Sequence, residues 1–109
     1  MRIYQLVQGD QAPQIQAVLT RDDDDSVIDF SGGSCALKFR AKDTTTVLFT
    51  LAAADVSDKF QNGIAIFSFS GTQLDIDAGY YEGEIEITHA SGTIETVFAV
   101  LNFYLRADF

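Results

Sequence analysis

The chain has 109 residues, of which 47% are hydrophobic and 21% are charged. This length suffices for one domain, which we expect to span residues 1–109, and the composition argues against a disordered chain. No apolar run approaches the roughly 20 residues that cross a bilayer, and the first residues lack the apolar stretch of a signal peptide. We therefore expect synthesis in a cytoplasm and no membrane partner.

The formal net charge is −9, from 16 acidic and 7 basic residues. Phosphate binding needs clustered Lys and Arg, so nucleic acid is not an expected partner. Cys35 and His89 are the only cysteine and the only histidine, which excludes an intramolecular disulfide and a thiolate metal cluster. Motifs for a nucleophile elbow or a phosphate loop are missing from the sequence. We expect no catalytic site, no metal and no cofactor.

Hydrophobic residues alternate with other residues along most of the chain, as Cys35, Leu37 and Phe39 do. Successive side chains of a strand point to opposite faces, so each alternating run predicts a strand with one buried face. Turn residues such as Gly32-Gly33 separate these runs. Short strands at this spacing favour an all-β fold, an immunoglobulin-like antiparallel β-sandwich. In chain order, the predicted strands are 3–8, 13–20, 26–30, 34–41, 46–51, 63–70, 80–89 and 93–105. Two further segments, 52–58 and 72–76, are each compatible with one short helical turn.

The two ends of the chain are candidate contact regions. Residues 1–12 predict either an N-terminal arm or an edge strand, and residues 102–109 form the other end. Both ends carry aromatic residues and an arginine, which are enriched in interface cores. The candidates are Arg2, Tyr4, Tyr104, Arg106 and Phe109. The alternative is that Tyr4 and Phe109 cap the two ends of the core.

A local motif, Asp77–Tyr81, has the form Asp-x-Gly-x-Tyr. This form is typical of the tyrosine corner of immunoglobulin-like sandwiches, in which a tyrosine hydroxyl turns back onto upstream backbone. Gly79 can adopt the backbone angles that such a corner needs, and Tyr81 can bury its ring. Gly83 stands where antibody domains have a cysteine, so the core must hold without an inter-sheet disulfide. A plain turn followed by a strand explains the same residues.

Acidic residues gather at two places. Asp22–Asp25 suggests a cation site, but calcium needs six to eight converging oxygen ligands, so we expect a solvated hairpin tip. Glu82, Glu84 and Glu86 share one face of a predicted strand. Either this acidic stripe meets a basic surface of a partner, or cations on adjacent strands neutralise it. The candidate cations are Lys38, Arg40 and Arg106.

The last predicted strand is apolar on both faces between residues 97 and 105. Strands of this kind are usually central in a sheet or covered by other parts of the protein. Two interpretations remain open. The strand runs through the interior of the sandwich, or a partner subunit packs on its outer face.

Five segments, 3–13, 28–32, 37–40, 77–84 and 103–109, carry a family resemblance through their order and spacing. Together they are similar to the N-terminal domain of upper baseplate proteins from tailed phages, over nearly the whole chain. The resemblance implies a β-sandwich that serves as an attachment module in a tail or baseplate. Family members with long C-terminal extensions carry receptor-binding proteins on them. This sequence stops at Phe109 without one, so we expect packing against neighbours instead.

These observations predict a non-enzymatic structural component of a tailed-phage virion, made in the host cytoplasm. We expect its partners to be other virion proteins, in symmetric multiple copies. One alternative is a capsid cement or decoration protein. A second is a carbohydrate- or receptor-binding module, against which the sequence offers no tryptophan.

Overall fold

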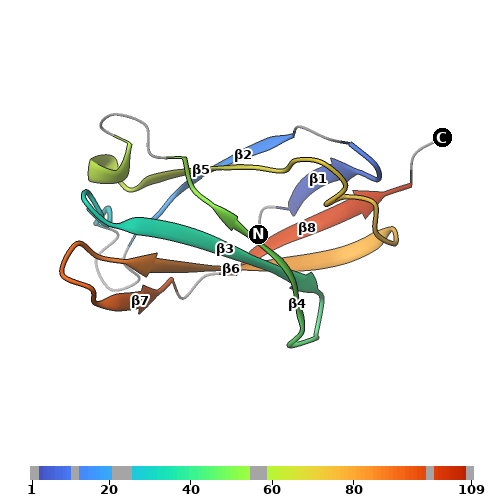
Figure 1. The fold of residues 1–109 in the computed structure, drawn as a ribbon. Coiled ribbons are helices and arrows are strands. Elements are labelled where there is room, and N and C mark those ends of the chain that lie inside the picture. Colours follow the sequence, from blue (N-terminus) through green and yellow to red (C-terminus); the bar gives the residue numbers. More distant parts are fainter. Residues whose placement is uncertain (1–2, 11–12, 21–25, 55–58, 98–99, 108–109) are drawn as a thin grey trace.

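The computed structural model describes residues 3–10, 13–20, 26–54, 59–97 and 100–107 (Figure 1). Within them no helix is long and apolar enough to cross a membrane. The elements are strands and one turn of 3-10 helix, so the prediction of an all-β fold is confirmed. In chain order they are β1 (Ile3–Val7), β2 (Gln14–Val18), β3 (Ser34–Ala41), β4 (Val47–Ala52), η1 (Phe60–Asn62), β5 (Ile64–Ser68), β6 (Gly79–Thr88), β7 (Ile94–Thr96) and β8 (Leu101–Arg106).

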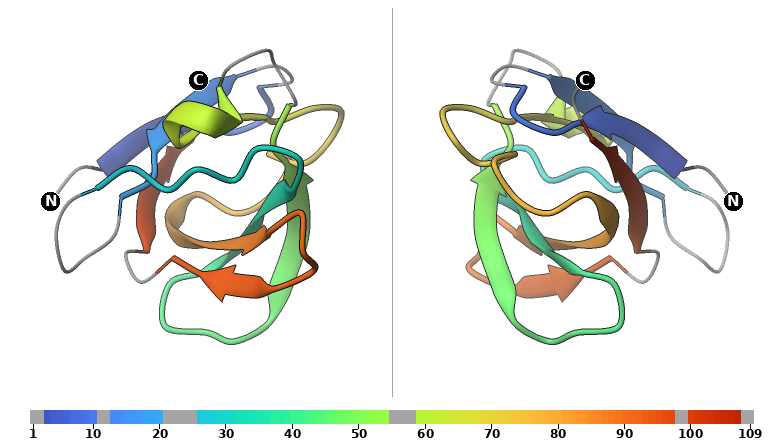
Figure 2. Two further views of the ribbon diagram at one scale, coloured as in Figure 1. Left: turned by 90° about the vertical axis from the view of Figure 1, so that its left-hand side faces the viewer. Right: turned by 90° about the vertical axis from the view of Figure 1, so that its right-hand side faces the viewer.

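The strands form two sheets, as a β-sandwich requires. The larger sheet has the order β1-β8-β6-β3-β4, with β7 also paired to β6, and the smaller sheet consists of β2 and β5. The end views show β2 and η1 on one side of the molecule and β7 on the opposite side (Figure 2). Strand alternation predicted these two layers because each strand has one buried face.

The predicted antiparallel pairing holds for the described strand pairs except at β1, which lies at the edge of the larger sheet. This strand runs parallel to β8, with Tyr4 opposite Phe103. A parallel pair needs a long crossover, and here the crossover is the whole chain between the first strand and the last. Alternation reports which side chains face inward and carries no information about strand direction.

The prediction of a strand at residues 26–30 was wrong. Only an isolated bridge joins Thr20 to Val27. Ile28 and Phe30 are buried all the same, and the Phe30 N–H donates to the Phe60 carbonyl oxygen at 3.1 Å. The alternation therefore came from a loop that inserts every second side chain into the core.

The predicted strand 93–105 is not one continuous strand. It contains β7 and β8, which both pair with β6, with Thr96 opposite Glu86 and Leu101 opposite Gly83. Thr96 and Leu101 are five residues apart, whereas their partners on β6, Glu86 and Gly83, are three residues apart. The chain between β7 and β8 therefore holds two residues more than the part of β6 that faces it.

Neither of the two predicted helical turns is a helix in the described residues. Segment 72–76 forms successive turns, in which the Asp75 N–H donates to the Thr72 carbonyl oxygen at 3.0 Å. Segment 52–58 lies partly outside the described residues, and the one helical element within the described ranges begins just after it, at Phe60.

The core is centred on Phe39 of β3. Its ring stacks on Phe49 at 4.7 Å and on Tyr81 at 5.1 Å between centroids, and it meets Phe69 and Phe103 at 5.7 and 5.1 Å. Ring pairs of this kind each contribute about 0.5–1.5 kcal/mol beyond the area they bury. Cys35 is buried on the same face of β3, four residues before Phe39, as the alternation predicts, and burial raises the pKa of its thiol to about 12.

Candidate interaction surface

The corner residues lie at the start of β6. Tyr81 packs its ring on Phe39, and its hydroxyl donates a hydrogen bond to the backbone carbonyl oxygen of Asp77. Gly79 has a φ of 148°, a value that residues with a Cβ rarely adopt. Burial, and after it the negative charge of Asp77, raises the pKa of Tyr81. The hydroxyl therefore stays protonated and remains a donor.

Gly83 occupies the position of the missing disulfide cysteine. A Cβ at Gly83 would lie 2.5 Å from the Leu37 Cδ1 and 3.0 Å from the Phe103 Cε2. Real Cβ atoms do not approach other atoms so closely, so the two large side chains fill the space that a cysteine would need. The sandwich is held at this point by hydrophobic packing.

The acidic stripe on the outer face of β6 is largely neutralised by β3. Lys38 Nζ lies 3.2 Å from Glu86 Oε2, and Arg40 Nη1 lies 3.7 Å from Glu84 Oε2. The Nε of Arg40 is buried and lies 3.5 Å from Glu82 Oε1, an ion-pair distance too long for a good N–H···O hydrogen bond. Two cations thus face three carboxylates, which favours the structural interpretation of the stripe over a partner-binding one.

The terminal candidates fall into three groups. Tyr4 faces inward, with its ring 5.5 Å from that of Phe103, so it belongs to the rim of the core. Tyr104 and Arg106 alternate with the buried Phe103 and Leu105 and so lie on the outer face of β8. The other two candidates, Arg2 and Phe109, lie outside the described residues.

One surface aromatic was missed. Tyr80 is 57% exposed, its ring centroid lies 4.9 Å from that of Tyr104, and Lys42 Nζ lies 5.9 Å from the centre of its ring. Because Tyr81 is the buried residue of the corner, its neighbour in the strand must point outward. That signal was present in the sequence.

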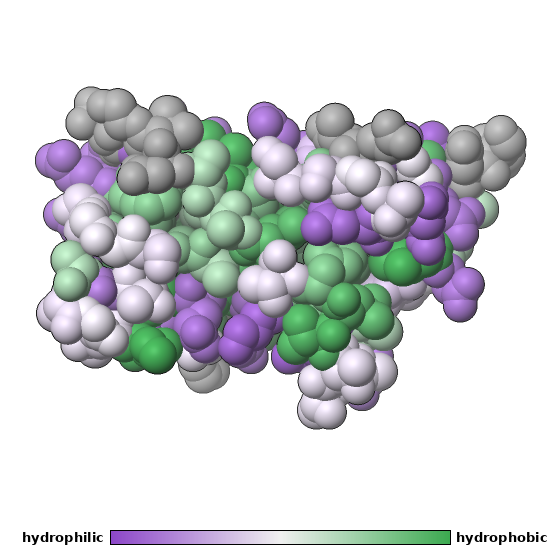
Figure 3. Space-filling model, viewed as in Figure 1, coloured by the Kyte–Doolittle hydropathy of each residue, from purple (hydrophilic) through white to green (hydrophobic). Residues whose placement is uncertain are grey.

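A second exposed group lies at the start of β4, where the pairing with β3 contains a bulge. Val47 and Leu48 are 44% and 47% exposed. Figure 3 shows hydrophobic side chains gathered at this end of β4, beside a hydrophilic region. The bulge turns two apolar side chains toward solvent, a position that strand alternation alone does not predict.

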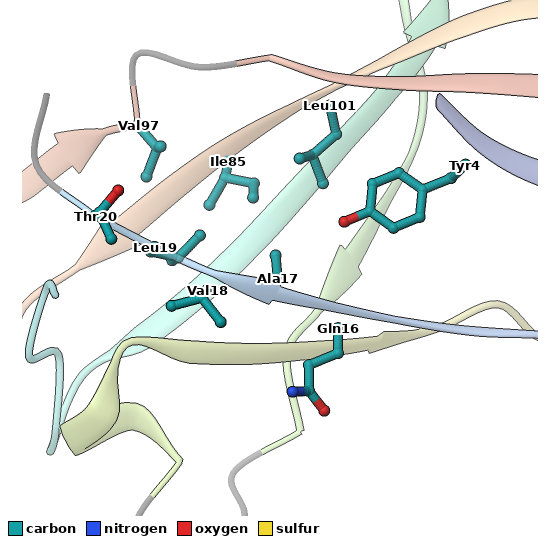
Figure 4. A pocket seen from close by; sticks show the side chains of 9 residues that line it. All are labelled: Tyr4, Gln16, Ala17, Val18, Leu19, Thr20, Ile85, Val97 and Leu101. Carbon is teal, nitrogen blue, oxygen red and sulfur yellow. The ribbon is translucent and has the colours of Figure 1, made fainter. Parts of the chain in front are cut away.

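A cavity of about 400 Å³ opens between the two sheets on the side of β2. Figure 4 shows Ala17, Leu19, Ile85 and Leu101 pointing into it, with the Tyr4 ring at one end. Five consecutive residues of one chain segment line it. Side chains alternate along a strand, so consecutive residues line one space only where that space runs along the strand's edge. The lining residues are Tyr4, Gln16, Ala17, Val18, Leu19, Thr20, Ile85, Val97 and Leu101.

Polar groups suited to chemistry are not assembled in the described part of the chain. His89 Nε2 lies 2.8 Å from Glu95 Oε1, and this pair contains no nucleophile. No group of three or more His, Cys, Asp or Glu side chains that could hold a metal ion occurs among the described residues. Asp22–Asp25, the predicted hairpin tip, lies outside them.

Comparisons with known proteins show likeness of fold. Neither a family model nor a curated protein sequence matches the chain. Among solved structures, the N-terminal domain of phage TP901-1 ORF48 superposes with a TM-score of 0.63 at 14% identity, covering 99% of this chain and 86% of that one. CopC from Methylosinus trichosporium OB3b gives a TM-score of 0.51 at 10% identity, over 98% and 86% of the two chains. The PmoD soluble domain from Methylocystis sp. ATCC 49242 (Rockwell) gives 0.50 at 17%, over 94% and 77%.

Proposed function

We propose that this chain is a non-enzymatic structural component of a tailed-phage virion that acts as an attachment module of the tail or baseplate. The observation that carries the proposal is the likeness to the phage TP901-1 ORF48 domain, which extends over 99% of the chain. Its TM-score of 0.63 exceeds the 0.51 and 0.50 of the two bacterial proteins. The sequence motifs similar to baseplate attachment domains support the same role.

The geometry agrees with attachment. The described residues assemble hydrophobic, aromatic and paired ionic groups on open surfaces, and an attachment module needs such groups for contacts with other virion proteins. A net charge of −9 fits protein partners better than nucleic acid or an anionic membrane. In this proposal the protein is made in the host cytoplasm and enters the particle in symmetric multiple copies.

Mass spectrometry of purified particles of the phage that encodes this chain tests the proposal. We expect the protein in intact particles, and immunogold labelling of those particles should place it on the tail. Labelling of the capsid surface would support a cement or decoration protein. Absence from intact particles would refute the virion role altogether.

A second candidate function is recognition of a carbohydrate, for which one observation speaks. The exposed Tyr80 and the half-buried Tyr104 form a pair of rings on the outer face of the larger sheet, with Lys42 beside Tyr80. Sugars pack on such aromatic surfaces. Binding on a glycan array that disappears in Tyr80→Ala would favour this function, whereas an array without signal would leave attachment as the role of the surface.

A further inference from the structure

The outer edge of β2 has backbone groups that are not used within the described fold. The Leu19 N–H donates to the Gly63 carbonyl oxygen at 2.7 Å, and the Phe69 N–H donates to the Pro13 carbonyl oxygen at 3.0 Å. Odd-numbered residues of β2 therefore bond toward β5. The N–H and C=O groups of alternate residues point to opposite edges of a strand. Those of Gln14, Gln16 and Val18 thus point away from β5, where the described residues place no strand beside them.

Between Pro13 and the charged residues that begin at Arg21, the sequence of this edge contains none of the residues by which proteins protect exposed strands. Natural edge strands carry charged residues, prolines or bulges that prevent pairing with another chain. The stretch 14–20 contains no charged residue and no proline, and its register with β5 is regular. Val18, the last residue of β2, is 57% exposed. An unprotected edge of this kind is a template for a further strand.

The cavity lies where the side chains of such a strand would point. The smaller sheet has two strands and the larger has six, five of them in the order β1-β8-β6-β3-β4, so among the described residues the smaller sheet does not span the larger one. On that flank Ile85, Val97 and Leu101 form an apolar floor beside the β2 edge (Figure 4). A third strand added to β2 would place every second side chain in this cavity.

We infer that β2 receives an extended segment of another protein, which pairs with its outer edge and inserts alternate apolar side chains into the cavity. Main-chain hydrogen bonds supply affinity in this mode of recognition, and the pocket for alternate side chains supplies specificity. The inference states how a partner is held, and it does not depend on that partner being a virion protein.

Charge decides between a different protein and a second copy of this chain. Each copy has a net charge of −9, so two copies repel as they approach, whereas a basic segment is attracted. The edge itself is uncharged from Gln14 to Thr20. The occupant is therefore an extended segment of a different protein, apolar at alternate positions and basic near its ends.

Nuclear magnetic resonance titration of the full ¹⁵N,¹³C-labelled chain tests this inference with a defined probe. The probe is a nine-residue peptide that alternates Val and Thr between terminal lysines. We expect saturable shifts at the amides of Gln14, Gln16 and Val18 and at the methyl groups of Ile85 and Leu101. The same peptide N-methylated at each internal residue keeps its side chains but loses its N–H donors, so it should bind at least about tenfold more weakly.

Two matched variants locate the binding edge. Gln16→Pro removes an outward N–H beside the cavity, and Gln5→Pro removes an outward N–H on β1, whose bonds to β8 come from its even-numbered residues. Gln16→Pro should weaken peptide binding about tenfold or more, and Gln5→Pro should leave it unchanged. Val97→Phe, which fills the cavity and keeps the edge, should weaken binding as well.

Several outcomes would overturn the inference. These are the absence of a saturable shift, equal binding of the N-methylated peptide, shifts confined to the surface around Tyr80, or loss of binding in Gln5→Pro instead of Gln16→Pro. Sedimentation of the protein alone supplies one more, because a dimer that Gln16→Pro dissociates would make a second copy the occupant. None of these results bears on whether the protein is present in virions, so the two proposals fail separately.

Discussion

The two edges of the small β2–β5 sheet face different surroundings. At the β5 edge the chain leaving β4 closes the flank, because the Ala54 N–H donates to the Ile66 carbonyl oxygen at 3.0 Å. At the β2 edge a cavity of about 400 Å³ lies behind outward-pointing backbone groups. One edge is completed by the protein's own chain, whereas beside the other the described residues place no strand. The β5 edge is therefore part of the packed domain, whereas the β2 edge is the candidate binding edge.

The largest expected effect compares the same substitution on the two flanks. Leu37 is fully buried on β3 and lies opposite Leu51 of β4, the strand whose continuation closes the β5 edge, so Leu37→Ala should lower the free energy of unfolding by about 2–5 kcal/mol. Leu101 is partly exposed at the cavity, so Leu101→Ala should cost roughly half as much or less. Urea unfolding of both variants measures the difference. Equal losses would mean that the open flank is packed as tightly as the closed one.

The next comparison removes one N–H from each edge. Ala54→Pro deletes the donor to Ile66 and should cost about 1–3 kcal/mol, because it leaves a carbonyl oxygen without its partner. Gln16→Pro deletes a donor that points away from the sheet, so its cost should be smaller by about 1 kcal/mol or more. Thermal unfolding of the two variants is the measurement. A larger loss in Gln16→Pro would show that the β2 edge is already paired within the chain.

A smaller effect belongs to the tyrosine corner at the start of β6. Tyr81→Phe removes the hydroxyl that donates to the Asp77 carbonyl oxygen, and we expect a loss of about 0.5–1.5 kcal/mol. Tyr80→Phe is the matched control, because Tyr80 is 57% exposed, and it should change stability little. If both variants unfold alike in urea, the corner hydrogen bond contributes nothing measurable.

The smallest effect at neutral pH concerns Cys35. Burial raises the pKa of its thiol from 9.0 to about 12. The folded state therefore favours the protonated thiol. The resulting stability is fully present below pH 9 and is lost as the pH rises toward 12. Subtracting the alkaline stability profile of Cys35→Ala from that of the natural protein isolates this dependence. Profiles that remain parallel from pH 8 to pH 11 would contradict it.

How far the sequence predicts this fold depends on what each residue pattern records. Alternation records the facing of side chains, so the burial of Cys35 and Tyr81 follows from it, and the exposure of Tyr80 is available from the same pattern. Strand direction leaves no mark in alternation, so the parallel pairing of β1 with β8 does not follow. A buried loop imitates a strand for the same reason, as Ile28 and Phe30 do.

The candidate site was harder to predict than the fold. Its cavity lies between two sheets of unequal strand number, and Val97 and Leu101 line it where β7 and β8 are separated by two residues more than the facing part of β6. Both are properties of pairing across distant segments, which composition and spacing do not contain. Glu82, Glu84 and Glu86 were a more visible surface feature in the sequence. Their neighbours Lys38 and Arg40 show that a conspicuous charge pattern can be satisfied within the protein.

The parallel pairing of β1 with β8 has a mechanical consequence. Ile3 lies opposite Asn102 and Val7 lies opposite Arg106, so the incoming and outgoing ends of the chain leave this strand pair at opposite ends (Figure 1). Tension applied between the two ends pulls the strands past each other along their length. All hydrogen bonds between them then bear the load together and do not open one at a time. Resistance to pulling, which is a kinetic property of unfolding, is therefore concentrated in these two strands.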